Sequence, residues 1–257
     1  MENLNGDVVK MLEVNKIYCM DCLEGMKQLD DKSIDLVLTD PPYNIGQDDK
    51  LTKKNGIVQS NKSCWGEWDN LEYNSYLKFI ESLMKECNRL MKDSASFIMF
   101  YDRFDMTYIR DFGKNLGWHT LNFYALVKNN PLPNMRKSGF CSGFELAIIF
   151  NKNKKQRKFN FLKQTEMINY FKYNNTIHKT SHPTEKPLEP LRRFCKILSC
   201  ENDIVLDPFM GSGSTAVACK QTGRRFIGFE VNQEYVDIAN KRLENTIRYP
   251  SIDDWRI

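Results

Sequence analysis

The chain has 257 residues, of which 41% are hydrophobic, 12% aromatic and 27% charged. These proportions are those of an ordinary globular protein and exclude a disordered or fibrous chain. Lys and Arg number 37 against 33 Asp and Glu, and a net charge of +4 does not by itself indicate a class of partner.

Strands and helices are expected to alternate along most of the chain. The predicted strands are 16–19, 34–39, 96–101, 121–127, 145–150, 203–206 and 225–229. Apolar residues at three- and four-residue spacing predict helices at 22–29, 73–91, 104–116, 214–221 and 233–246, and one more that ends near residue 199. This alternation predicts a single α/β domain, 1–257, with a mostly parallel, twisted sheet and helices on both faces.

Two polar stretches interrupt this pattern. Residues 46–70 form a connection of a length that is typical of a functional or disordered loop. From Lys128 to Lys163 nine basic residues stand against one acid, Glu145. Such a block is typical of an anion-binding surface or of a solvated loop, and charge alone favours neither.

Membrane and metal binding are not expected. No apolar run is long enough to span a membrane and the first ten residues contain no apolar signal region, which predicts a cytoplasmic protein with no membrane partner. The eight cysteines are scattered, and we expect them to be reduced. Cys19 and Cys22 have zinc-like spacing, but no second cluster completes four ligands, so we predict no metal site.

A glycine-containing loop, residues 207–215 (DPFMGSGST), connects a predicted strand to a predicted helix. Gly211 and Gly213 allow a left-handed backbone and a close approach of a ligand, and the start of the helix offers N–H groups to an anion. The next strand ends at Glu230, whose carboxylate suits the two hydroxyls of a ribose. The order of these features favours a nucleoside-cofactor site over a simple tight turn, although neither the dinucleotide nor the NTP fingerprint is present.

A second loop, residues 39–44 (TDPPYN), follows the apolar strand 34–39, at the end where ligands bind in open α/β sheets. The two prolines fix the backbone and donate no N–H, while Asp40 adds a carboxylate and Tyr43 a flat aromatic face. This set suits a planar group with an exocyclic amino nitrogen. The alternative is a rigid turn with a helix-capping aspartate and a core tyrosine.

Three motifs in order resemble the β-class DNA amino-methyltransferases. Residues 40–43 (DPPY) resemble their catalytic motif, 182–187 (HPTEKP) the segment before the cofactor-binding helix, and 207–213 (DPFMGSG) their S-adenosylmethionine motif. The resemblance covers about residues 16–243. It implies a Rossmann-like class I methyltransferase fold with a circularly permuted motif order, and site-specific methylation of adenine N6 on a flipped-out base of DNA. Cytosine N4, an amino group in RNA, and a non-catalytic nucleic-acid-binding module stay open as alternatives.

The resemblance also assigns roles to residues. The catalytic residues would be Asp40, Pro41, Pro42 and Tyr43. The residues that bind the S-adenosylmethionine cofactor would be Asp21, Asp40, Thr184, Lys186, Asp207, Phe209, Gly211, Ser212, Gly213, Ser214, Thr215 and Glu230. From the residues alone, Asp21 would serve equally as the N-cap of the helix that follows it, and Lys186 as a solvated residue.

We expect DNA contacts from the polar stretches. Residues 47–70 are predicted to form a mobile DNA-contacting loop, and residues 151–180 a small target-recognition insertion. The predicted DNA-binding residues are Lys53, Lys54, Lys128, Arg136, Lys137, Lys154, Lys155 and Arg157. The resemblance leaves open whether a cognate restriction endonuclease is a partner and whether the protein is a monomer or a homodimer.

Overall fold

The computed structural model describes residues 12–43, 72–131, 133, 137, 139–174 and 185–248. Within these residues one sheet has the strand order β1-β8-β7-β2-β3-β5-β4-β6. The strands are β1 (Lys16–Cys19), β2 (Ile34–Thr39), β3 (Met91–Tyr101), β4 (His119–Lys128), β5 (Phe144–Asn151), β6 (Tyr170–Tyr173), β7 (Ile204–Asp207) and β8 (Arg225–Glu230). Only the pairings of β5 with β3 and β4 are antiparallel, which confirms the predicted mostly parallel sheet.

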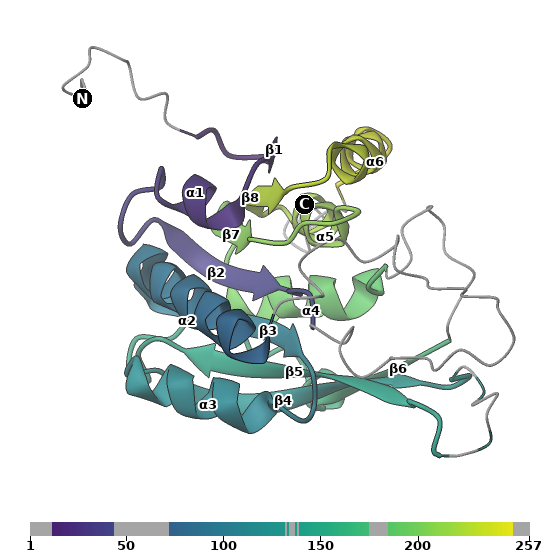
Figure 1. Cartoon of the computed structure of the whole chain (residues 1–257). Coiled ribbons are helices and arrows are strands. Elements are labelled where there is room, and N and C mark those ends of the chain that lie inside the picture. Colours follow the sequence, from purple (N-terminus) through teal and green to yellow (C-terminus); the bar gives the residue numbers. More distant parts are fainter. Residues whose placement is uncertain are drawn as a thin grey trace, which may run out of the picture.

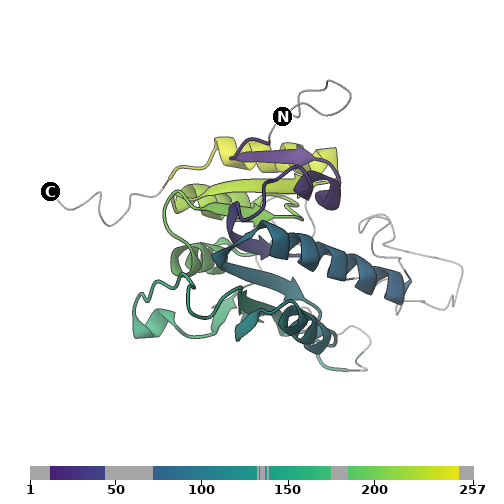
Figure 2. The ribbon, with the colours of Figure 1, turned by 90° about the vertical axis from the view of Figure 1, so that its left-hand side faces the viewer.

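Helices cover both faces of this sheet (Figure 1). One face carries α1 (Cys22–Met26), α2 (Tyr73–Leu90) and α3 (Met106–Asn115), and the other carries α4 (Leu188–Leu198), α5 (Ser214–Gln221) and α6 (Gln233–Glu244). Successive side chains of a strand point to opposite faces, so Val37 of β2 packs in the first core and its neighbours Leu36 and Leu38 pack in the second. Figure 2 shows the sheet between the two layers of helices.

The observed elements differ from the predicted ones mainly at their ends. Strand β3 begins at Met91, directly after α2, and α1 ends at Met26 instead of residue 29. Strand β6 was not predicted, because four residues (YFKY) with alternating exposure give too short a pattern. Its pairing with the distant strand β4 determines its structure. Among the described residues, no helix combines the length and the apolar character that a membrane span requires.

The strand order places the two motif loops side by side. Strands β2 and β7 are parallel neighbours, with Leu36 opposite Val205 and Val37 opposite Leu206. From β7 the chain crosses one face through α5 to β8, whereas β2 and β3 are covered by α2 on the other face. At such a switch point the loops after the two strands diverge and leave a crevice at their carboxyl ends. Asp40 and the loop after Asp207 therefore meet at this edge of the sheet.

Candidate active site

The loop between β7 and α5 is fixed against the end of β8. Gly211 and Gly213 have φ angles of 49° and 84°, in the region that favours glycine. The Gly211 N–H donates to one oxygen of Glu230 at 2.9 Å, and the other oxygen accepts from the Asn232 N–H at 2.9 Å. Burial raises the pKa of Glu230, and these two N–H groups oppose that rise. The carboxylate is thus held directly beside the glycine loop.

The structure corrects the reason for a glycine at position 213. The sequence suggested that both glycines let a ligand approach, but a Cβ at Gly213 would lie 2.7 Å from the Cβ of Ala239. Ala239 belongs to α6, so the close neighbour is a packed helix. Gly213 is required for a positive φ and for the contact between the loop and α6.

Arg242 of α6 also fixes this loop in place, and the sequence did not identify Arg242 as a residue of the site. Its guanidinium donates to the Ser212 carbonyl at 2.6 Å, to the Ser212 hydroxyl at 2.9 Å and to the Ser214 hydroxyl at 3.4 Å. It also forms an ion pair with Glu185. Burial lowers the pKa of Arg242, and Glu185 opposes that change. The two serines were predicted to contact a cofactor. Through Arg242 they connect the glycine loop to Glu185, the residue before Lys186.

Asp207, Phe209 and Thr215 complete the inner side of the loop. The Asp207 carboxylate is 3% exposed and accepts from the Phe209 N–H at 3.1 Å. Burial raises the pKa of Asp207 to about 7, against the effect of hydrogen bonds from Thr215 and Phe209. The Phe209 ring meets Phe79 of α2 edge-on, with 6.0 Å between the ring centroids. These contacts connect the loop to helices on both faces of the sheet.

Asp21 lies at the same edge, next to β8. It caps α1, because its carboxylate accepts from the N–H groups of Leu23 at 2.9 Å and Glu24 at 3.1 Å. The strand before it, β1, pairs with β8 so that Cys19 is opposite Glu230. The capping alternative is confirmed, and a cofactor role for Asp21 stays a prediction.

The loop after β2 is held by tyrosines. The Tyr43 hydroxyl donates to one oxygen of Asp40 at 2.7 Å, and the Tyr76 hydroxyl donates to the Pro42 carbonyl at 2.6 Å. The Tyr43 ring lies against Tyr101, with 6.2 Å between centroids. Burial and the Asp40 carboxylate raise the pKa of Tyr43. Within the described part of the chain, no donor bonds the Pro41 carbonyl, which leaves it available as an acceptor next to Asp40.

Lys186 lies next to Asp40, in a row of side chains with alternating negative and positive charge. Its ammonium is 2.6 Å from the second Asp40 oxygen and 3.1 Å from Glu145, whose other oxygen is 2.7 Å from Lys128. The rings of Phe100 and Tyr43 face it at 5.2 and 5.7 Å. Burial alone would lower the pKa of Lys186, but Asp40, Tyr43 and Glu145 raise it well above the usual value. Lys186, which was predicted to contact the cofactor, therefore contacts the candidate catalytic carboxylate, Asp40.

The same row of charges contains Lys128. Lys128 was predicted to contact DNA, but its side chain is only 19% exposed and pairs with Glu145. Burial alone would raise the pKa of Glu145, but Lys186 and Lys128 lower it to about 2. This ion pair with the half-buried Glu145 competes with a contact to phosphate, and DNA contact by Lys128 stays a prediction.

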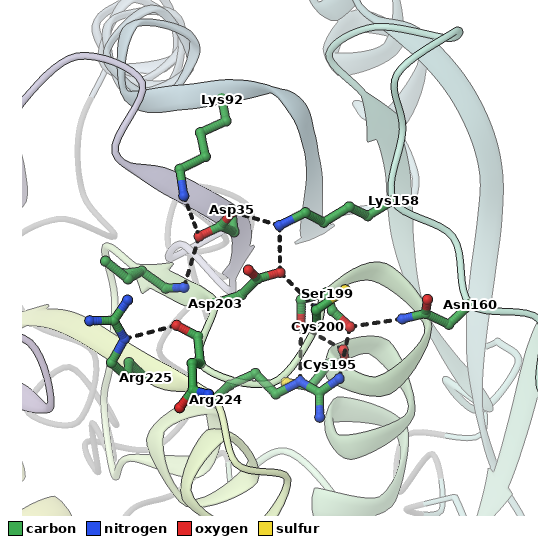
Figure 3. Close-up of polar contacts among 12 residues, drawn as sticks. Asp35, Lys92, Lys158, Asn160, Cys195, Ser199, Cys200, Asp203, Arg224 and Arg225 are labelled. Atoms are coloured by element: carbon green, nitrogen blue, oxygen red, sulfur yellow. Dashed lines mark hydrogen bonds and ion pairs between the residues drawn. The ribbon is translucent and has the colours of Figure 1, made fainter.

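The basic residues just after β5, within 152–158, lie at the opposite end of the sheet. Asn151 pairs with Ser96 where β5 ends, and Lys152 donates to the carbonyls of Asn88 at 2.7 Å and Met91 at 2.8 Å. Lys158 bonds Asp35, at the start of β2, and Asp203, each at 2.7 Å (Figure 3). The exposed basic residues between them are Lys154, Lys155 and Arg157. They are a strand length away from Asp40, which counts against their contact with DNA that enters the site.

Two segments in the described part of the predicted insertion 151–180 lie at opposite edges of the sheet. The first part of the insertion lies at the amino edge of the parallel strands, whereas β6 returns to the carboxyl edge, with Tyr173 opposite Lys128. Lys137 is described and exposed. Thr184, Lys53, Lys54 and Arg136, together with the loop 47–70, lie outside the described residues. In the part of the chain that is described, no cluster of His, Cys, Asp or Glu has the composition of a metal site.

Comparisons with known proteins agree with this geometry. A model for an N6/N4 DNA methylase family matches residues 34–241. The type II methyltransferase M.HinfI of Haemophilus influenzae is 34% identical over 251 residues, which cover 90% of this chain and 68% of that protein. The crystal structure of the M1.HpyAVI–SAM complex matches with a TM-score of 0.65 and 30% identity, over 88% of this chain and 98% of the other. The cytosine-N4-specific PvuII DNA methyltransferase matches in fold, with a TM-score of 0.69 at 21% identity, over 88% of this chain and 85% of that one.

Proposed function

The chain belongs to the N6/N4 DNA methylase family, and we propose that it methylates the N6 amino group of adenine at a specific sequence in DNA, with S-adenosylmethionine as the methyl donor. The proposal rests on one observation. Asp40 and the Pro41 carbonyl lie next to the glycine loop and Glu230, at the switch point between β2 and β7. An acceptor pair for an amino group thus lies beside a site that suits a nucleoside.

The residues at this edge fit an S-adenosylmethionine molecule. Each oxygen of Glu230 accepts one backbone N–H and retains acceptor capacity for a ribose hydroxyl. Asp21 lies next to it, and the N–H groups at the start of α5 suit a carboxylate. The relative M1.HpyAVI, which matches nearly all of this fold, has been crystallised with SAM. When bound here, the cofactor would supply an electrophilic methyl group and would need no acid to release its product.

Asp40 and Pro41 would activate the nucleophile. The N6 lone pair of adenine is delocalised into the ring, so the free amino group is a weak nucleophile. If Asp40 and the Pro41 carbonyl accept its two hydrogens, the nitrogen can pyramidalise and direct its lone pair out of the ring. The same acceptors stabilise the positive charge that develops on N6, which is a preorganised electrostatic contribution. Tyr43, held by Asp40 and Tyr101, is proposed to stack on the extruded base.

Adenine is proposed over cytosine because position 40 is Asp, which in the resembled family marks N6 chemistry. A type II methyltransferase among the relatives supports the further proposal that a restriction endonuclease of the same specificity accompanies this chain. For DNA binding we propose the carboxyl edge of the sheet, where Lys137 precedes β5 and exposed Lys172 lies on β6.

The test is to express the chain in a host without modified DNA bases and to identify the methylated base and its sequence context. We expect N6-methyladenine in one recurring sequence. Asp40→Ala should lower turnover on the order of 10²–10³-fold, because it removes one preorganised acceptor. Asp102→Ala is the matched control, since Asp102 follows the neighbouring strand β3 and only caps Phe104 at 2.8 Å.

Other products of the same experiment would contradict the proposal. N4-methylcytosine would overturn the adenine assignment and leave the family unchanged. Methylation of RNA oligonucleotides in preference to DNA would overturn the substrate. Near-normal turnover of Asp40→Ala would show that Asp40 is a turn residue.

A further inference from the structure

Both carboxylate oxygens of Asp40 are already bonded within the protein. One accepts from Tyr43 at 2.7 Å and the other is 2.6 Å from the Lys186 ammonium. Each oxygen keeps a second lone pair, so an amino group that donates to Asp40 must do so beside these partners or in place of one of them. Lys186 is the partner that resembles the substrate, because it presents a nitrogen donor to Asp40 between the rings of Tyr43 and Phe100. In this arrangement the ammonium occupies one acceptor position of the carboxylate that the target base needs.

A cation at this acceptor also opposes methyl transfer. The amino nitrogen gains positive charge as it takes up the methyl group, and a neighbouring positive charge disfavours that change. The ammonium additionally weakens Asp40 as an acceptor, because it neutralises the carboxylate. The competent site therefore requires that Lys186 leave Asp40 while its own charge stays compensated.

Glu145 can provide that compensation. It lies 3.1 Å from the Lys186 ammonium, on strand β5, and Lys128 fixes its other oxygen at 2.7 Å. Lys186 can consequently move from one carboxylate to the other over a short distance without losing its ion pair. We propose, on the basis of the function proposed above, that Glu145 is a positioning residue that holds Lys186 away from Asp40 when the target base enters.

A purely structural role for Glu145 predicts different behaviour. Glu145 pairs with Leu126 in the ladder between β4 and β5, so it could simply stabilise that pair of strands. In that case its loss would affect folding and would not depend on Lys186. In the proposed role, its loss leaves Lys186 on Asp40, and the consequence disappears when Lys186 carries no charge.

The experiment is a double-mutant cycle with Glu145→Gln and Lys186→Met, assayed on unmethylated duplex that contains the target sequence. Glu145→Gln should lower kcat about 10- to 100-fold and change KM for DNA less than kcat. In the Lys186→Met background the same substitution should have no further effect. Glu145→Asp, which retains the carboxylate, should recover part of the loss. Equal effects of Glu145→Gln in both backgrounds would overturn the proposal.

A binding measurement without cofactor separates this inference from the proposed function. The free enzyme is titrated with two duplexes, one with the target base and one with an abasic site at that position. Glu145→Gln should shift the ratio of the two Kd values about tenfold against the target base, because Lys186 then competes for Asp40. The ratio involves no methyl transfer, so it reports on Glu145 whichever amino base the enzyme modifies. An unchanged ratio would overturn the role of Glu145 while leaving the proposed reaction intact.

Discussion

The effect of replacing Gly213 on the free energy of unfolding can be worked out from the structure. Its φ is 84°, and a Cβ there would lie 2.7 Å from the Cβ and 3.1 Å from the Cα of Ala239. A left-handed alanine costs about 1–2 kcal/mol, and the stiffer unfolded chain returns about 0.4–1 kcal/mol. Overpacking against α6 adds about 1–3 kcal/mol. We therefore expect Gly213→Ala to lower the free energy of unfolding by about 2–4 kcal/mol.

Gly117 provides a matched control for this measurement. Its φ is 85°, and nothing lies within 4 Å of a Cβ built there. Gly117→Ala should therefore show the backbone cost alone, about 1 kcal/mol, in urea denaturation of the ligand-free protein followed by circular dichroism. Ala239→Gly should recover part of the loss in Gly213→Ala. Equal losses at the two glycines would refute the packing argument, and lost cofactor binding at unchanged stability would restore the ligand-access explanation.

Two further predictions concern charge. Burial raises the pKa of Asp207 to about 7, so the folded protein retains a proton that the unfolded chain releases at ordinary carboxyl pH. The resulting stability is complete below the unfolded pKa and is lost as the pH rises through about 7, so the stability of wild type relative to Asp207→Asn should fall by roughly 2 kcal/mol between pH 5 and 8 in urea denaturation. A pH-independent difference would contradict a neutral buried carboxyl. For DNA binding, alanine at Lys137 and Lys172 should each reduce the slope of log affinity against log salt by about 0.9. Alanine substitution of the exposed basic residues at the amino edge, Lys154, Lys155 and Arg157, should leave the slope unchanged. A reduced slope would show that these residues contact phosphate.

The order of strands and helices could be predicted because the sequence directly reflects burial. Every residue of β2 is buried, and its apolar run stops at a pair of prolines. Helix α2 repeats apolar residues on the one side that packs on the sheet. The start of β3 could not be predicted in this way, because Lys92 within it is polar and is held by Asp35 of β2 at 2.8 Å. A pairing between strands can thus extend a strand through residues that look like a loop.

The candidate site could be predicted where its residues are close in the sequence or follow a buried strand. Asp40 and Tyr43 form a local motif, and Glu230 ends a strand whose neighbour carries the glycine loop. The residues that bond Lys186 and Ser212 come from elements that are distant in the sequence. Glu145 is brought to Lys186 by the antiparallel strand β5, and Arg242 reaches Ser212 from α6. No local pattern encodes either contact, because both depend on the order of strands in the sheet.

Each end of β2 has a carboxylate that is bonded by lysine. Asp35, at the start of the strand, is 2% exposed and is bonded by Lys158 and Lys92. Asp40, just after its end, is bonded by Lys186. At the first end burial would raise the pKa of Asp35, but Lys158 and Lys92 lower it, and Lys158 also pairs with Asp203.

At the other end Lys186 likewise has two carboxylates within reach, Asp40 and Glu145. The difference between the two ion clusters is that Asp40 belongs to the candidate active site. Buried ion pairs contribute little net stability after desolvation, but removing one member of such a pair is costly. The Asp35 cluster accordingly holds residues 152–158 to the sheet. A cluster with an alternative partner can exchange its pairs at little cost, because no charge is left uncompensated during the exchange. The lysines at both ends of β2 thus neutralise internal carboxylates, so the proposed DNA-binding surface is to be sought among exposed basic residues at the carboxyl edge, such as Lys137 and Lys172.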